Sequence, residues 1–124
     1  MKIKVMFHCG NSPKMERVIE LTIALAKKDV NLIKLYTHES FIWNTVGNDG
    51  LISFDNMVHE LAKKPTVTEL NIENALSHGN SAMCEGTLSF ADGAFLYFCN
   101  VVKFVNTAKD ALIKEAHTYF VDKI

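Results

Sequence analysis

Apolar residues recur at helical spacing in the first half of the chain and follow strand-like patterns in the second half. Over residues 13–27 the apolar positions fall three or four apart, which predicts an amphipathic helix. Ser12 suits the N-cap of this helix, and Pro13 suits its first turn. A later helix is predicted to begin after Ser53, a second good N-cap, and to end before Pro65.

The stretch from Asp29 to Gly47 changes from a helical period to a strand-like one. Asp29 can cap a short helix, and the residues that follow it share one apolar helical face. Residues 41–43, Phe-Ile-Trp, suit a strand. We therefore expect a short helix that turns directly into a strand crossing a hydrophobic cavity.

The second half of the chain contains four strand-like runs separated by turn-forming residues. These runs are residues 66–77, 81–91, 94–105 and 111–121. Helices followed by antiparallel strands predict an α+β fold. Because the chain has no repeat, linker or low-complexity segment, residues 1–124 are predicted to form a single domain. Residues 1–10 fit either a strand or a helical turn that ends at Gly10.

The Asp92-Gly93 pair predicts a two-residue hairpin turn, which would set the register of the strands on either side. In that register Glu85 pairs with Asn100, and both share a face with Phe98. A β-bulge would shift the pairing by one residue and exchange the two faces of one strand. Both arrangements of the hairpin remain open at this point.

The composition limits which partners and which cellular compartment can be expected. The chain has 13 basic and 14 acidic side chains with no block of one sign, which argues against nucleic-acid or anionic-membrane partners. The three cysteines, Cys9, Cys84 and Cys99, lack zinc-site spacing and fit inert thiols in a reducing compartment. No apolar run is long enough for a signal peptide or a membrane span. We expect a cytoplasmic protein without a metal site, whose partner is a small molecule or a protein.

Three segments, KKDVNLIKLYTHESFIWNTVG, LSHGNSAMCEGTL and ADGAFLYFCNVVKF, resemble the nuclear transport factor 2-like superfamily, in particular its SnoaL-like and ketosteroid-isomerase-like members. The resemblance covers nearly the whole chain. It implies a cystatin-like cone, in which a curved antiparallel or mixed sheet wraps around three N-terminal helices. It does not imply one reaction, because this fold carries isomerases, cyclases, hydratases, dehydratases and binding modules.

The resemblance also allows the ketosteroid isomerase residues to be matched one at a time. The general base falls at Asn44, the oxyanion-hole carboxylic acid at Asn100, and the oxyanion-hole tyrosine at or near Leu21. An amide cannot abstract a proton, so the match implies that this chain does not isomerise ketosteroids. What it implies instead is a cavity containing two neutral amides, without a cofactor.

The candidate site residues follow from the register and the resemblance together. Glu85 is the candidate general acid or base, because burial beside Asn100 would raise its pKa. The alternative is that Glu85 faces solvent or lies at an interface. The candidate ligand-binding residues are Asn44, Asn100, Phe98, Leu21 and His117. Trp43, next to Asn44 on one strand, is expected to point away from the cavity.

Two functions remain open. The first is binding or transformation of a small hydrophobic molecule in an apolar pocket, and the second is a homodimeric interaction module with a filled pocket. The dimer would form through the convex sheet face, which the predicted register lines with apolar side chains. That face would carry Phe90, Phe95, Leu88, Tyr97, Cys84 and Val101. A cavity of a few hundred Å³ would favour the first function.

Overall fold

The structure, a computed structural model, describes residues 1–6, 12–47 and 50–122. Within these residues the chain forms the helices α1 (Pro13–Lys27), α2 (Val30–Tyr36) and α3 (Phe54–Lys63). Each begins at a predicted N-cap, where the side chains of Ser12, Asp29 and Ser53 accept a backbone N–H. None of the described helices has the length and apolar character needed to cross a membrane.

The strands form one sheet of seven, in the order β1-β4-β5-β6-β7-β2-β3. Their bounds are β1 (Lys2–Val5), β2 (Thr37–Thr45), β3 (Leu51–Ser53), β4 (Val67–His78), β5 (Ser81–Phe90), β6 (Phe95–Phe104) and β7 (Ile113–Asp122). β1 pairs with β4, and β2 with β7, in parallel, whereas the other neighbours are antiparallel. The ambiguous N-terminal segment is thus a strand over residues 2–5, and residues 7–10 lie outside the described residues. The sheet confirms the expected mixed α+β fold.

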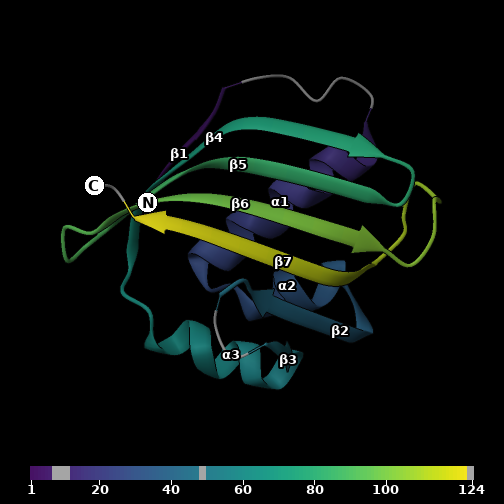
Figure 1. Ribbon diagram of the computed structural model, residues 1–124, viewed down its shortest axis with the longest axis horizontal. Helices are drawn as coiled ribbons and strands as arrows, with labels where there is room; N and C mark the ends of the chain where they lie inside the picture. Colours follow the sequence, from purple (N-terminus) through teal and green to yellow (C-terminus); the bar gives the residue numbers. More distant parts are fainter. Residues whose placement is uncertain (7–11, 48–49, 123–124) are drawn as a thin grey trace.

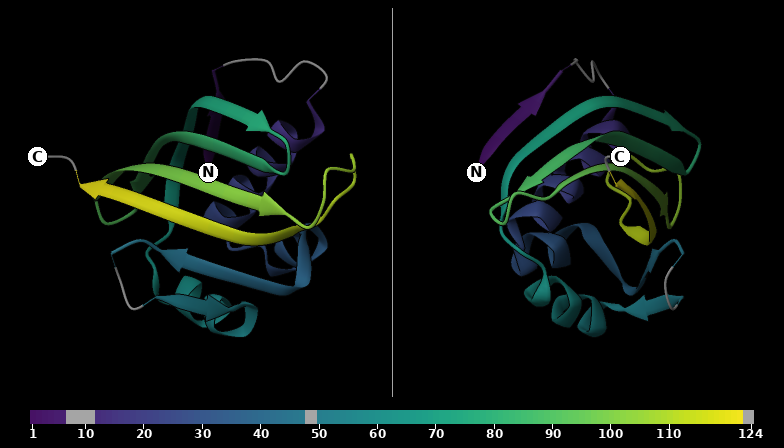
Figure 2. Two further views of the ribbon diagram at one scale, coloured as in Figure 1. Left: turned by 45° about the vertical axis from the view of Figure 1, so that its right-hand side comes forward. Right: turned by 60° about the vertical axis from the view of Figure 1, so that its left-hand side comes forward.

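The sheet curves around α1, which lies along its concave face (Figures 1 and 2). The core forms at this contact, where Val18 and Leu21 of α1 meet the inward side chains of the central strands. Burial of these apolar side chains is the main stabilising contribution, at about 25 cal/mol per Å² of apolar surface removed from water. In Figure 1 no element is drawn in front of β4–β7, so their convex face is left uncovered by the described residues.

The hairpin between β5 and β6 closes with one residue more than the sequence predicted. The backbone N–H of Phe90 donates to the Ala94 carbonyl at 3.0 Å, which leaves a three-residue loop whose last residue, Gly93, has φ 89°. Glu85 therefore pairs with Cys99 rather than with Asn100. The prediction of a two-residue turn was wrong, and the one-residue shift held as its alternative is what forms.

The shift exchanges the faces of β5. Cys84 and Leu88, expected on the convex face, are buried in the core, and Glu85 lies on the convex face. Gly86 also faces inward, where a Cβ atom would lie 1.7 Å from the Asn71 carbonyl oxygen of β4. Only glycine fits this contact, so position 86 fixes how closely β4 and β5 approach each other.

Candidate functional site

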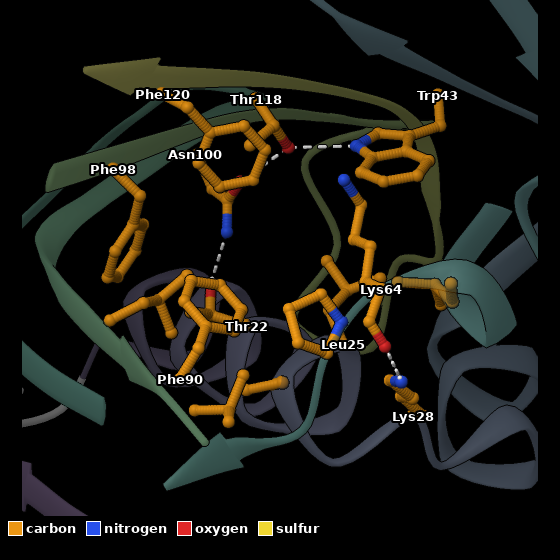
Figure 3. A pocket seen from close by; sticks show the side chains of 15 residues that line it. Thr22, Leu25, Lys28, Trp43, Lys64, Phe90, Phe98, Asn100, Thr118 and Phe120 are labelled. Carbon is orange, nitrogen blue, oxygen red and sulfur yellow. Dashed lines mark hydrogen bonds between the residues drawn. The ribbon is translucent and has the colours of Figure 1, made fainter. Parts of the chain in front are cut away.

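A pocket lies between α1, the end of α3 and the concave face of the sheet, and it is partly open to solvent (Figure 3). Its volume is about 60 Å³. Its walls are mostly aliphatic and aromatic, with polar groups at two places. The lining residues are Thr22, Leu25, Ala26, Lys28, Trp43, Leu61, Lys64, Pro65, Val67, Leu88, Phe90, Phe98, Asn100, Thr118 and Phe120. The pocket therefore draws on residues far apart in the sequence.

A chain of buried hydrogen bonds forms one side of the pocket. The Trp43 Nε1–H donates to Thr118 Oγ1 at 2.8 Å, and the Thr118 hydroxyl donates to Asn100 Oδ1 at 2.6 Å. Asn100 Nδ2 in turn donates to Thr22 Oγ1 at 2.8 Å, and that hydroxyl lies 3.1 Å from Cys84 Sγ. Because the indole N–H is only a donor, it sets the direction of the hydrogens as far as Thr22.

Each member of this chain comes from a different element. Thr22 lies on α1 and Trp43 on β2, while Asn100 and Thr118 face each other across β6 and β7. All are buried, and within the described residues no buried side-chain nitrogen or oxygen lacks a hydrogen-bond partner. The Asn100 amide keeps one N–H and one acceptor lone pair beyond these bonds. It can therefore both donate to and accept from a ligand.

Two lysines stand where α1 and α3 end. Lys28 Nζ donates to the backbone carbonyl of Lys64, the residue that follows α3. The Lys64 ammonium lies 5.4 Å from the centre of the Phe120 ring, a cation–π distance. Neither lysine forms an ion pair with a described carboxylate. The pocket thus has an amide on one side and unpaired positive charge at its rim.

The predicted ligand-binding residues divide between the two faces of the sheet. Phe98 and Asn100 line the pocket, so the geometry allows the roles predicted for them. Leu21 is only 1% exposed and packs in the core, and its neighbour Thr22 is the residue of α1 that reaches the pocket. Sequence reasoning did not identify Thr22, whose buried hydroxyl on an apolar helix face was the available signal.

Asn44 and His117 point away from the pocket. Asn44 Nδ2 donates to His117 Nδ1 at 3.2 Å, and His117 Nε2 lies 3.1 Å from a Glu115 carboxylate oxygen. Trp43, expected on the opposite side from the pocket, instead faces into it and is 3% exposed. The apolar pair Phe41 and Trp43, two residues apart, was the signal for the inward face of β2. The predicted orientation of this strand was therefore wrong.

Glu85 does not contact the pocket either. Its carboxylate accepts from Asn74 Nδ2 at 3.1 Å on the exposed face, opposite Cys99. Burial, and then the negative charge of Glu85, raises the pKa of the Cys99 thiol. The expected pairing of Glu85 with Asn100 was wrong because it relied on the two-residue turn.

The donor set around the pocket suits recognition of an organic group. No carboxylate and no histidine occurs among the described lining residues. Over the described ranges, no cluster of three or more His, Cys, Asp or Glu residues could hold a metal ion. The polar groups available to a ligand are therefore hydroxyls, one amide and the two lysines.

Comparison with known proteins gives structural relatives only. No protein-family profile and no curated protein matches the sequence. A protein of unknown function described as NTF-2 like, from Burkholderia xenovorans LB400, aligns with a TM-score of 0.74 at 17% identity, over 90% of this chain and 85% of its own.

Two further structures carry named activities. A candidate SnoaL-like polyketide cyclase of Shewanella denitrificans OS-217 aligns with a TM-score of 0.71 at 13% identity, over 87% of this chain and 90% of its own. An LEH-like epoxide hydrolase of Mycobacterium tuberculosis aligns with a TM-score of 0.66 at 15% identity, over 88% of this chain and 83% of its own. The resemblance seen in the sequence is thus confirmed at the level of structure. This chain has the nuclear transport factor 2-like α+β cone fold.

Proposed function

We propose that this protein binds a small, narrow, largely apolar molecule in the pocket of its cone. The observation that carries the proposal is the buried hydrogen-bond chain from Trp43 to Thr22, which holds the Asn100 amide at the wall of an apolar pocket. Ligand sites typically combine apolar walls with a few well-placed polar groups. Asn100 would orient a hydroxyl or carbonyl group of the ligand.

The size of the pocket limits the ligand. Its volume of about 60 Å³ is well below the few hundred Å³ typical of sites for drug-sized molecules. One water needs roughly 10–15 Å³ on such a measure, so the interior has room for roughly four to six non-hydrogen atoms, and further atoms of a ligand would lie in its open mouth. A short alkyl chain fits this description, whereas a fused ring system does not.

Binding is proposed here rather than proton transfer. The groups around the pocket are amide, hydroxyl and lysine, and a general acid or base of the carboxylate type is not among the described lining residues. The candidate base position Asn44 lies on the other face of the sheet. We therefore expect no ketosteroid isomerisation by the purified protein, measured as the change in ultraviolet absorbance of the steroid enone. Isomerisation that Asn100→Leu abolishes would contradict this assignment.

The single tryptophan of the chain provides the test. Because Trp43 lines the pocket, hexanol should change its fluorescence saturably, and calorimetry should give the same affinity. Ala26→Leu would fill the pocket from α1 and should weaken binding by about tenfold or more. Ala62→Leu makes the same change on the exposed side of α3 and should leave binding unaltered. Absence of saturable binding by the wild-type protein would overturn the proposal.

A second candidate function is that of a homodimeric interaction module. The observation that favours it is a set of exposed apolar side chains on the convex face of β6 and β7. Tyr97, Tyr119 and Val121 are 44%, 45% and 60% exposed, and the strand register places Tyr97 beside Val121. Contiguous apolar surface of this kind is typical of interfaces. The small volume of the pocket favours the same candidate.

Sedimentation would test the dimer. The wild-type protein should sediment at twice its 13.9 kDa chain mass at micromolar concentration. Tyr119→Glu places a charge in the proposed interface and should yield monomers. Leu35→Glu, at a still more exposed apolar position on α2, should leave the dimer intact. A wild-type protein that stays monomeric would contradict this second candidate.

A further inference from the structure

The charge around the pocket is distributed unevenly. Asn100 and the two threonines are neutral, whereas Lys28 and Lys64 both lie on the lining near the ends of α1 and α3. The other walls are apolar. A ligand that fills this space would therefore meet hydrocarbon along most of its length and a positive charge at one end.

The ammonium group of Lys28 already binds a group of the protein itself. It has a left-handed backbone conformation with φ 58° at the end of α1, and its ammonium donates to the Lys64 carbonyl. A carbonyl just past the end of a helix carries partial negative charge, so this contact is favourable without any ligand. Lys28 thus holds the two helix ends together and positions Lys64.

Lys64 retains capacity for a ligand. Its ammonium has no carboxylate partner within the described residues and is held over the ring of Phe120. In Figure 3 its side chain runs along the edge of the pocket, with the nitrogen on the side of Trp43. The next residue back, Lys63, pairs with Glu60 at 3.3 Å instead. Of these two adjacent lysines, only Lys64 offers an uncompensated charge to the pocket.

We propose that the ligand of this pocket is a short unbranched monocarboxylate, whose carboxylate binds the Lys64 ammonium while its alkyl chain occupies the apolar interior. This inference rests on the proposed binding function and names its ligand class. A charge-assisted hydrogen bond of this kind is about twice as strong as a neutral one. A single negative charge suits the Lys64 ammonium, which, unlike that of Lys28, donates no hydrogen bond within the described residues, and the small interior suits a short chain.

The chemistry argues against larger anions. The rim of the pocket is formed by the C-terminal ends of α1 and α3, where backbone carbonyls rather than N–H groups point outward. Phosphate sites in proteins typically use the N–H groups of helix N-termini. One ammonium beside helix C-termini suits a monoanion better than a phosphate.

The test compares hexanoate with hexanol, which has the same chain length and no charge at neutral pH. Both would be titrated into the protein with Trp43 fluorescence and calorimetry as readouts. Hexanoate should bind about tenfold more tightly than hexanol, the factor expected for one charge-assisted hydrogen bond at a partly buried site. Raising the salt concentration should weaken hexanoate binding and leave hexanol binding unchanged.

Variants at two adjacent lysines test which charge is responsible for the tighter binding of hexanoate. Lys64→Met keeps most of the apolar stem and removes the charge, so it should abolish the difference in affinity between hexanoate and hexanol. Lys63→Met removes a neighbouring charge that does not line the pocket and should leave both affinities unchanged. Thermal unfolding of each variant would verify that it is folded.

The possible outcomes separate the two proposals. Equal affinity for hexanoate and hexanol would overturn the carboxylate inference and leave the binding function standing. Equal loss of hexanoate affinity in Lys63→Met and Lys64→Met would also overturn it, because the effect would then come from the general surface charge. Failure of both compounds to bind would overturn the inference together with the proposed function.

Discussion

Residues 98–102 of β6 show how differently the two faces of this sheet are used. Phe98, Asn100 and Val102 face the cone, where Phe98 and Asn100 form part of the wall of the pocket and Val102 is buried in the core. Cys99 and Val101, between them in sequence, face outward and are only partly buried. The pleat alone separates these two environments, since adjacent residues of a strand point in opposite directions. A candidate residue can therefore be judged only after its face is known.

The ionisable groups follow the same division. Glu85, Glu115 and His117 all lie on the convex side of the central strands, together with the raised-pKa thiol of Cys99. On the concave side, neutral groups form the hydrogen-bond chain from Trp43 to Thr22, and the charged groups Lys28 and Lys64 lie at the rim of the pocket. Burying a carboxylate costs far more than burying an amide with its partners satisfied. This cost accounts for the absence of carboxylates among the described residues that line the pocket.

The largest effect is expected where the concave face approaches neighbouring backbone. Gly86→Ala would place a methyl group 1.7 Å from the Asn71 carbonyl oxygen, and neither strand can move without breaking its pairing. We expect the free energy of unfolding to fall by about 3 kcal/mol or more, measured by urea denaturation. Gly79→Ala is the matched control, because it has open space around it and a φ of 57°. Its cost should be about 1–2 kcal/mol, from backbone strain alone.

An intermediate effect on the free energy of unfolding is expected when asparagines on opposite faces of the sheet are replaced. Asn100→Leu leaves the Thr118 hydroxyl without its acceptor and Thr22 without its donor, both buried. Its cost to the free energy of unfolding should be about 2–3 kcal/mol. Asn44→Leu removes only a half-buried contact to His117 and should cost about 1 kcal/mol or less. Equal costs in the same urea experiment would contradict the assignment of the two faces.

The smallest effect concerns Cys99. Because its pKa is raised above the ordinary value of 9.0, less thiolate is present at pH 8, and reaction with a disulfide reagent should be slower than for a solvated thiol. Glu85→Gln removes the smaller of the two causes and should speed this reaction only partly, since burial remains. Glu115→Gln, on β7, is the control. The measurement would use a Cys9→Ser background so that Cys9 does not contribute.

The raised pKa of Cys99 also predicts how the stability of the fold changes with pH. With a raised pKa in the folded state, the Cys99 thiol stabilises the fold fully below pH 9.0, and this contribution is lost as the pH rises through the folded pKa. Stability attributable to Cys99 should therefore decline above pH 9.0 and not below it. A decline with falling pH instead would show that the thiolate is the favoured form in the fold.

The elements of the fold could be predicted because their signals are local. Ser12, Asp29 and Ser53 each cap a helix where the sequence placed one, since a capping side chain bonds to a backbone N–H three residues away. The short strand β3 (Leu51–Ser53) was missed, because three residues carry too little periodicity to detect. A strand was thus predictable only where it was long enough to show a periodic pattern.

The faces of the strands were harder to predict, because they depend on single-residue details. The Asp92-Gly93 pair suggested a two-residue turn, but Ala91 joins the loop and Ala94 donates its N–H to Asp92. The alternation along β5 contained the correct answer: Cys84, Gly86 and Leu88 face inward, and the polar residues between them face outward. Alternation over a whole strand was a better guide than the type of one turn.

The two outermost strands of the sheet are also its shortest in the described residues, β1 with four residues and β3 with three. Exposed sheet edges are sites where strands of other molecules can add, and short edge strands limit this form of aggregation. β1 covers the first part of β4, a strand of twelve residues. Residues 2–5 therefore cover residues 69–72 of β4, and a truncation or fusion that displaces them would expose this part of the edge to strands of other molecules.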